Sequence, residues 1–206
     1  MAEPARQQAR SLEFWFEFGS TYSYLSAMRI EDCARAAGVA LAWRPFLLGP
    51  VFRSLGWETS PFVLQQAKGR YMWRDMEREA ARLGLPFRRP SAFPRTALLP
   101  MRVATLGVAE PWIGAYCRRV MLSNWALDRE IDNQETVLEA LDGLVPDPAQ
   151  VMAAALSPAN KLRLRESTEE AAARGIFGAP SFFVGDELFW GNDRLEAALA
   201  LARAGA

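Results

Sequence analysis

Two hydroxyl side chains stand three residues apart in the segment Ser20-Thr21-Tyr22-Ser23, directly after Gly19. If a helix begins here, its first backbone N–H groups lack intrahelical partners and its dipole is positive at this end. A hydroxyl at such a place can donate a hydrogen bond to an anion, including a thiolate carried by a ligand. Because serine forms no disulfide, dithiol exchange is excluded at this position. The alternative is that Ser20 serves only as the helix N-cap, for which serine is a preferred residue.

The rest of the composition restricts the chemistry further. The chain has no histidine and only two cysteines, Cys33 and Cys117. The lack of histidine rules out a Ser-His-Asp triad and a histidine-bearing zinc site. Neither cysteine has a partner at redox or metal-ligand spacing, so we expect both to pack in the interior and predict no metal site. Proton transfer near neutral pH must then use a hydroxyl, a carboxylate, water or a thiol supplied by a cofactor.

A strand and a helix are predicted on either side of Gly19. Residues 12–18 hold five large apolar side chains with two intercalated glutamates, which favours a mostly buried strand. Beyond Gly19, apolar residues recur at helical spacing, and Gly38 stands where a C-terminal cap is expected. The sequence therefore predicts a strand, a tight turn and one helix that begins near Ser20.

The C-terminal segment predicts a hairpin followed by a helix. A strand over 180–184 begins with Pro180, which is tolerated at the first position of a strand. Gly185-Asp186 is a two-residue hairpin signal, and residues 187–190 supply the partner strand. A final amphipathic helix opens within 191–195, and either Asn192 or Asp193 is expected to cap it.

Between these ends the signals are almost entirely helical. Residues 39–43 favour a second strand, parallel to the first through a right-handed crossover, and 46–61 is a loop punctuated by glycine and proline. Helical runs are predicted at 61–84, 95–106, 111–122, 134–141, 148–156 and 158–174. A helical block between two strand-bearing ends indicates an insertion in a discontinuous α/β domain. We predict domain parts 12–59 and 175–206, with the helical insertion at 60–174.

Charge and hydropathy exclude two classes of partner. The 24 basic and 24 acidic residues balance, which leaves no electrostatic footprint for nucleic acid. No apolar run reaches the length needed to span a membrane. Residues 1–11 are expected to form a disordered tail, because the first ten are small, polar and charged without the apolar segment of a secretion signal. We therefore expect cytoplasmic localisation.

Three motifs together resemble one known family. They are FEFGSTYSYL near the start, GPVFRSLGW after the second predicted strand and GIFGAPSFFVGDELFWGNDRL near the end. From about Leu12 to Ala204 the chain resembles the 2-hydroxychromene-2-carboxylate isomerases, glutathione-dependent relatives of kappa-class glutathione transferases in the DsbA-like branch of the thioredoxin superfamily. This resemblance implies a thioredoxin-like fold with a large all-helical insertion, in which Pro180 is cis and faces the first helix. The cysteine pair of the superfamily corresponds here to Ser20 and Ser23.

The resemblance also implies glutathione as the cofactor. Its sulfur would meet Ser20, and its cysteinyl backbone would pair with Ala179 beside Pro180. Its γ-glutamyl end would reach the turn formed by Trp190, Gly191, Asn192 and Asp193. A helix N-terminus suits the carboxylate of that end, and Asp193 suits its ammonium group. Judged by residue type alone, Asn192 and Asp193 can also be explained purely as helix caps.

The implied substrate is an aromatic carboxylate held by Arg53, Trp57 and Thr96. A cation and an aromatic side chain are the chemical types that such a ligand requires. A surface arginine and a packed tryptophan are the alternative reading of the first two residues. In the implied reaction the glutathione thiolate adds to a conjugated carbon of 2-hydroxychromene-2-carboxylate, the ring opens and a former double bond rotates. Elimination then gives trans-o-hydroxybenzylidenepyruvate.

Two other functions are compatible with the same sequence. A kappa-type glutathione transferase shares the thiolate site but leaves the conjugate as its product. A non-catalytic glutathione-binding protein of thioredoxin-like fold would bind without turnover. The family also implies a homodimer, whereas the residues themselves leave the oligomeric state and the true substrate open.

Overall fold

A mixed sheet of four strands lies at the centre of the computed structural model, which describes residues 11–205. The strands are β1 (Ser11–Phe16), β2 (Ala40–Pro45), β3 (Ser181–Val184) and β4 (Glu187–Trp190), and their spatial order is β2-β1-β3-β4. Strand β2 runs parallel to β1, which confirms the predicted parallel pairing, whereas β3 pairs antiparallel with both β1 and β4. The two ends of the chain thus form one sheet.

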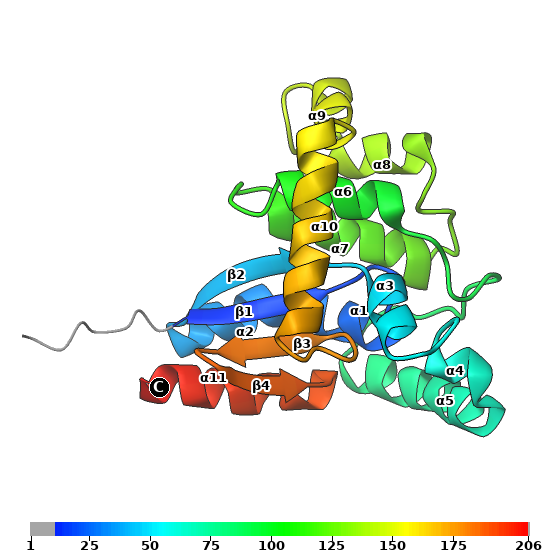
Figure 1. Cartoon of the computed structure of the whole chain (residues 1–206), viewed down its shortest axis with the longest axis vertical. Coiled ribbons are helices and arrows are strands. Elements are labelled where there is room, and N and C mark those ends of the chain that lie inside the picture. Colours follow the sequence, from blue (N-terminus) through cyan, green and yellow to red (C-terminus); the bar gives the residue numbers. More distant parts are fainter. Residues whose placement is uncertain (1–10, 206) are drawn as a thin grey trace, which may run out of the picture.

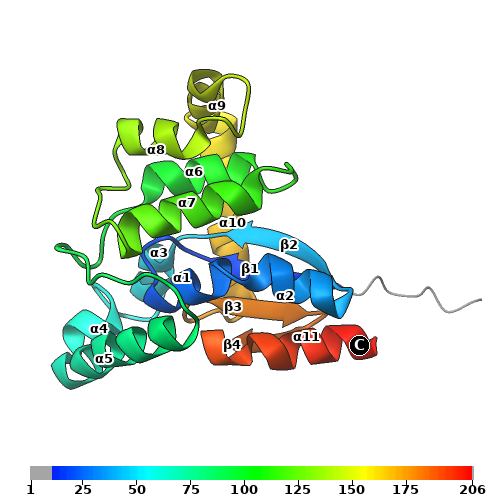
Figure 2. The ribbon, with the colours of Figure 1, turned by 180° about the vertical axis from the view of Figure 1, so that it is seen from behind.

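Helices cover both faces of this sheet. Alternation along β1 sends Leu12, Phe14 and Phe16 into the main core and Trp15 into a smaller cluster on the opposite face. Helices α3 (Leu48–Ser54) and α10 (Pro158–Ala173) lie on the Trp15 face (Figure 1). Helices α1 (Thr21–Ala27), α2 (Ile30–Ala37) and α11 (Leu195–Ala204) lie on the other face (Figure 2). Strand β1 is therefore buried on both sides, as its apolar run predicts.

The segment after β1 differs from the prediction in two details. The strand ends at Phe16 rather than at residue 18, because the Ser20 N–H bonds to the Glu17 carbonyl oxygen at 3.1 Å and closes a turn. The single helix expected up to Gly38 is divided into α1 and α2 at Arg29, whose φ is −131°. Gly38 ends α2 in the left-handed region, with φ 67°, as predicted.

The expected loop 46–61 contains the helix α3. Sequence patterns miss this helix because Gly49 and Pro50 lie in its first turn, where proline is tolerated since that turn has no intrahelical N–H partner to lose. Leu48 and Val51 are buried and join the cluster around Trp15. The helix thereby fixes Phe52 and Arg53 beside the end of the sheet.

Between β2 and β3 the described residues form only helices. Beyond α3 these are α4 (Pro61–Leu64), α5 (Gln66–Arg82), α6 (Leu98–Leu106), α7 (Ile113–Trp125), α8 (Gln134–Leu141), α9 (Pro148–Ala155) and α10. The run predicted at 61–84 is interrupted at Gln65, whose φ of −107° and ψ of 88° separate α4 from α5. The buried side chains of α5 to α8 belong to the same core as β1. The proposed domain boundaries stay a prediction.

The C-terminal hairpin forms as predicted, but the capping of the last helix does not. A short 3-10 turn, η1 (Asn192–Arg194), precedes α11, and neither Asn192 nor Asp193 makes a side-chain cap. The prediction fails because Asn192 is buried and its amide oxygen accepts hydrogen bonds from Ser26 Oγ at 3.1 Å and Arg29 Nη2 at 3.0 Å. Asn192 thus ties η1 to the junction between α1 and α2.

Two remaining expectations concern the N-terminal tail and membrane-spanning helices. Of the predicted tail 1–11, residues 1–10 lie outside the described part, and Ser11 is the first residue of β1. Among the described residues, no helix is long and apolar enough to cross a membrane.

Candidate active site

The start of α1 and the segment before β3 meet at Ser20. Ser20 is 7% exposed and caps α1, since its Oγ accepts a hydrogen bond from the Ser23 N–H at 3.3 Å. The same Oγ donates to the Ala179 carbonyl oxygen at 2.8 Å, and the Ala179–Pro180 peptide bond is cis. The N-cap role expected for Ser20 is confirmed. The hydroxyl also carries a second bond that connects the two ends of the chain.

The turn before Ser20 is in close contact with the segment that precedes α6. A Cβ atom at Gly19 would lie 2.9 Å from the Arg95 carbonyl oxygen, so only glycine fits without moving that backbone. The Arg95 guanidinium is buried and donates to Asp128 Oδ1 at 2.8 Å and Asn124 Oδ1 at 3.0 Å. These bonds hold the segment against the turn. Hydrogen bonds from Ser91 and Arg95 lower the pKa of Asp128 to about 2.

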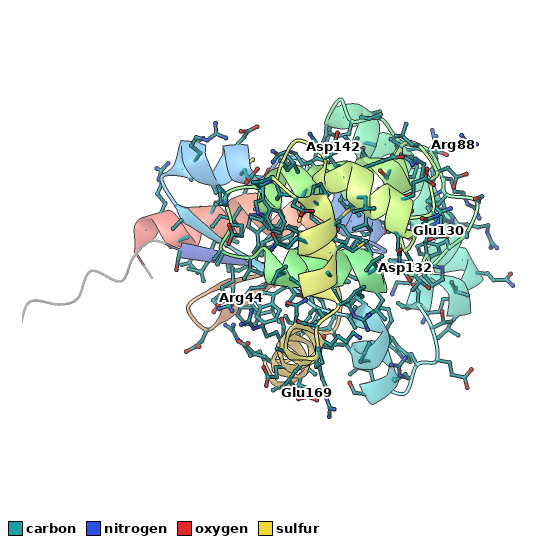
Figure 3. The ribbon with its side chains drawn as sticks, turned by 90° about the horizontal axis from the view of Figure 1, so that it is seen from above. Arg44, Arg88, Glu130, Asp132, Asp142 and Glu169 are labelled. Atoms are coloured by element: carbon teal, nitrogen blue, oxygen red, sulfur yellow. The ribbon has the colours of Figure 1, made fainter. Side chains whose placement is uncertain are left out.

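The segment before α6 is also held in place at the start of that helix. The Leu99 N–H donates to Asp132 Oδ1 at 2.6 Å, and the Asp132 N–H donates to Glu130 at 3.1 Å. Glu130 and Asp132 lie together beside the helices α6 and α7 in the view from above (Figure 3). The loop between α7 and α8 therefore supports the segment 93–98.

A cavity of about 490 Å³ opens at this corner. Its volume is in the range of small-molecule sites, and its wall is mainly apolar with a few polar groups. The polar and charged residues on its wall include Glu17, Ser20, Arg53, Glu58, Lys68 and Thr96. At its rim, the exposed rings of Phe177 and Trp190 pack edge to face with centroids 4.9 Å apart. The corner can thus accommodate an aromatic ligand next to a hydroxyl and a cation.

A second cavity, of about 620 Å³, adjoins the first. The two share Tyr22, Phe62, Lys68, Ala179 and Trp190, and the second is also lined by Gly191, Asn192, Asp193 and Asp75. The Tyr22 hydroxyl donates to Asp75 Oδ2 at 3.0 Å, which connects α1 to α5 beside this cavity. Burial and the Asp75 carboxylate raise the pKa of Tyr22 above its usual value. A ligand that occupied both cavities would pass Ala179.

The residues expected from the sequence fall into distinct places. Ser20, Arg53 and Thr96 line the first cavity, whereas Gly191, Asn192 and Asp193 line the second, and Ala179 and Trp190 belong to both. The other two expected residues are absent from both linings within the described part. Trp57 packs against Phe52, which lines the first cavity, with ring centroids 5.7 Å apart, and Pro180 is buried.

The turn at residues 190–193 depends on two glycines. Gly191 has a φ of 112°, which side chains rarely adopt, and a Cβ there would lie 2.6 Å from Asp193 Oδ1. A Cβ at Gly178 would lie 2.4 Å from Trp190 Nε1, so glycine allows the indole to lie against the backbone before Pro180. The side chain of Asp193 remains 71% exposed and pairs with Arg194 at 3.1 Å. Its carboxylate is therefore accessible from the second cavity.

Glu17 is a cavity residue that the sequence analysis did not select. It lies between β1 and Ser20, and burial raises the pKa of its carboxyl to about 8. Glu13, in the same apolar run, is instead paired with Arg44 at 3.0 Å and Arg174 at 2.5 Å, and its pKa is lowered. The signal in the sequence was a glutamate placed among residues of a buried strand.

Comparison with known proteins places the chain in a family. The DSBA-like thioredoxin domain model matches residues 11–201. A 2-hydroxychromene-2-carboxylate isomerase from Sphingobium xenophagum is 29% identical over 193 residues, which cover 91% of this chain and 95% of the relative. Human glutathione S-transferase kappa 1 is 25% identical over 201 residues, covering 91% and 88% of the two chains.

Solved structures agree with this assignment. The structure of a 2-hydroxychromene-2-carboxylate isomerase superimposes with a TM-score of 0.84 at 27% identity, covering 94% of this chain and 95% of that one. The predicted α/β thioredoxin-like fold with its helical insertion is thereby confirmed. The chain belongs to the DSBA-like thioredoxin domain family, and within it resembles the 2-hydroxychromene-2-carboxylate isomerases and the kappa-class glutathione transferases.

Proposed function

We propose that this protein is a glutathione-dependent cis-trans isomerase of the 2-hydroxychromene-2-carboxylate isomerase type. The observation that carries the proposal is the Ser20 hydroxyl, which caps α1, bonds to Ala179 and faces a cavity that also contains Arg53. The similarity to isomerases over almost the whole chain supports it. Glutathione as cofactor is supported by the kappa-class transferase relatives.

Glutathione is proposed to span the two adjoining cavities. Its cysteinyl backbone would pair with Ala179, the residue before cis-Pro180, as an added extended strand. Its γ-glutamyl end would extend into the second cavity, where the exposed Asp193 carboxylate suits the ammonium group. Asn192 would act through the backbone, because its side chain is occupied by Ser26 and Arg29.

Ser20 would stabilise the glutathione thiolate. Its hydroxyl has one proton, which is donated to Ala179 in the free protein, so the thiolate must draw this proton toward itself as it binds. The positive end of α1 adds to the effect. A tenfold rise in the thiolate fraction needs about 1.4 kcal/mol, which one charge-assisted hydrogen bond can supply.

The aromatic carboxylate is proposed to occupy the first cavity. Arg53 is exposed on α3 and lines this cavity, so its guanidinium can bind the substrate carboxylate, and Thr96 lies on the wall before α6. Trp57 would act indirectly, since it packs against Phe52, which lines the cavity. The proposal therefore assigns Trp57 to the support of the cavity wall rather than to contact with the substrate.

The test is an isomerisation assay with 2-hydroxychromene-2-carboxylate, run with and without glutathione. We expect conversion to trans-o-hydroxybenzylidenepyruvate only when both the protein and glutathione are present. Arg53→Ala should raise KM for the carboxylate, and Arg53→Lys should recover part of the affinity because it keeps the charge. Equal conversion without glutathione would contradict the proposed cofactor, and no conversion at all would contradict the proposed reaction.

A kappa-type glutathione transferase is the second candidate, favoured by the 25% identity to the human kappa 1 enzyme. It would use the same thiolate site but release the thioether adduct. Incubation with glutathione and an aromatic electrophile, followed by mass spectrometry, separates the two activities. Accumulation of a stable adduct together with failure to isomerise would favour the transferase. Binding of glutathione without either product would identify a non-catalytic binding protein.

A further inference from the structure

Glu17 is the first residue of the turn that connects β1 to Ser20. It is the first residue after β1, its carbonyl oxygen accepts the Ser20 N–H, and its side chain lines the first cavity. Both carboxyl oxygens lie close to Gly19, because a Cβ built there would be 3.6 and 3.7 Å from them. A carboxyl group therefore faces the cavity beside the residue that precedes the proposed thiolate site.

This carboxyl has no partner of its own. No hydrogen bond or ion pair to it occurs within residues 11–205, and burial is the only cause of its raised pKa of about 8. The other ionisable groups on the cavity wall are Tyr22 of α1, Arg53 of α3, Glu58 of the following loop, Lys68 of α5 and Arg95 before α6. Arg95 is committed to Asp128 and Asn124, and Tyr22 to Asp75.

Glu17 is only partly exposed, and a carboxyl that is largely removed from water without a partner lowers the stability of a fold, so its place on a cavity wall indicates a chemical role. The proposed reaction requires a proton transfer that neither Ser20 nor the thiolate supplies. A 2-hydroxychromene is a cyclic hemiketal, and its opening moves one proton from the hydroxyl group to the ring oxygen. The chain has no histidine for this step. An acid with a pKa near the working pH is the most effective group for it.

We propose, on the basis of the isomerase function above, that Glu17 is the general acid and base that opens the chromene ring. The protonated carboxyl gives its proton to the ring oxygen while the bond between that oxygen and the hemiketal carbon breaks and its electron pair moves to the oxygen. The resulting carboxylate takes the hydroxyl proton while the electron pair of that O–H bond completes the new carbonyl group. Glu17 is thus restored, and no other reactant is consumed.

Three variants test this role. Glu17→Gln keeps the size of the side chain but carries no transferable proton, so kcat should fall by about 100-fold or more. Glu17→Asp keeps the carboxyl and should recover part of the rate. Glu58→Gln removes another carboxyl on the same cavity wall and is the matched control. Glutathione affinity, measured by calorimetry, should be the same in the parent and in Glu17→Gln.

The pH profile gives a readout that a structural role would not move. Because the protonated form starts the reaction, kcat should fall as the pH rises through about 8 in the parent. This alkaline limb should be absent from the residual activity of Glu17→Gln and present in Glu58→Gln. The acid limb should follow ionisation of the bound glutathione thiol, recorded separately by its ultraviolet absorbance.

The outcomes separate the two levels of the proposal. If the parent isomerises the substrate and Glu17→Gln keeps its kcat and its alkaline limb, the role of Glu17 is overturned while the proposed function stands. If the parent binds glutathione but opens no chromene ring, the proposed isomerase function and the role of Glu17 are both overturned. If Glu17→Gln loses kcat but also loses glutathione affinity in proportion, Glu17 is a structural residue and the acid-base role is rejected.

Discussion

The Ser20 hydroxyl donates a hydrogen bond of 2.8 Å to the carbonyl oxygen of Ala179, which lies 159 residues away in the sequence. This bond joins the start of α1 to the residue before cis-Pro180. The proposed cofactor site therefore exists only when the first strand and the C-terminal hairpin have formed one sheet. In the free protein this bond uses the single hydroxyl proton of Ser20, which would have to be donated to a bound thiolate instead.

Ser20→Ala should remove most glutathione-dependent turnover and keep the fold. The variant loses the donor to the thiolate and the N-cap of α1, so kcat should drop at least about tenfold and stability by about 1 kcal/mol. Steady-state kinetics and urea unfolding measure the two effects. Ser23→Ala is the control, because the Ser23 hydroxyl is buried without a partner among the described residues and its loss should affect neither quantity strongly. Full activity in Ser20→Ala would remove Ser20 from the mechanism.

Glu17→Gln should change the pH dependence of stability. The folded state holds the Glu17 proton more tightly than the unfolded chain, so its contribution is fully present below the ordinary pKa of 4.5 and is lost as pH rises to about 8. The stability of the parent relative to the variant should fall by up to about 1.4 kcal/mol for each pH unit in this window. Urea unfolding of both proteins at several pH values measures the difference. Parallel curves would show that Glu17 ionises normally.

Gly19→Ala should destabilise the wall of the first cavity. The new Cβ would lie 2.9 Å from the backbone carbonyl oxygen of Arg95, whose side chain is held by Asp128, so we expect a loss of about 1–3 kcal/mol. Gly49→Ala is the matched control, because its Cβ would meet only Arg53 Nη1 at an ordinary 3.6 Å. That variant should be as stable as the parent or slightly more so. Equal stability of the two variants would argue against the close approach at Gly19.

Asp193→Ala should weaken the binding of glutathione by about tenfold, the value of one charge-assisted hydrogen bond at an exposed position. Cysteinylglycine lacks the γ-glutamyl group, so its affinity should be the same for the parent and the variant. Calorimetric titration of both ligands into both proteins completes the comparison. An equal loss of affinity for the two ligands would show that Asp193 does not contact the γ-glutamyl end.

Local signals in the sequence predict the elements that depend on neighbouring residues. Ser20 caps α1, Gly38 ends α2, and Pro61, Pro148 and Pro158 begin helices because each acts within one turn of its own position. The hairpin around Gly185 and the parallel pairing of β1 with β2 follow from the same kind of pattern.

Features fixed by distant contacts are not predictable in this way. The break between α1 and α2 is held by Arg29 and Asn192, and the same contact explains why Asn192 does not cap the last helix. Glu17 lines the cavity together with Arg95 and Phe177, residues that lie far from it in the sequence, so its unpaired position could not be read from its neighbours. The oligomeric state, the cellular location and the roles of the site residues stay predictions.

The ionisation of bound glutathione tests the central claim most directly. The ultraviolet absorbance of the thiolate is followed against pH for free glutathione and for glutathione bound to the parent and to Ser20→Ala. We predict that the thiol ionises at least about one pH unit lower when bound to the parent, and that Ser20→Ala returns it toward the free value. A bound thiol that ionises at the same pH as free glutathione would contradict the account.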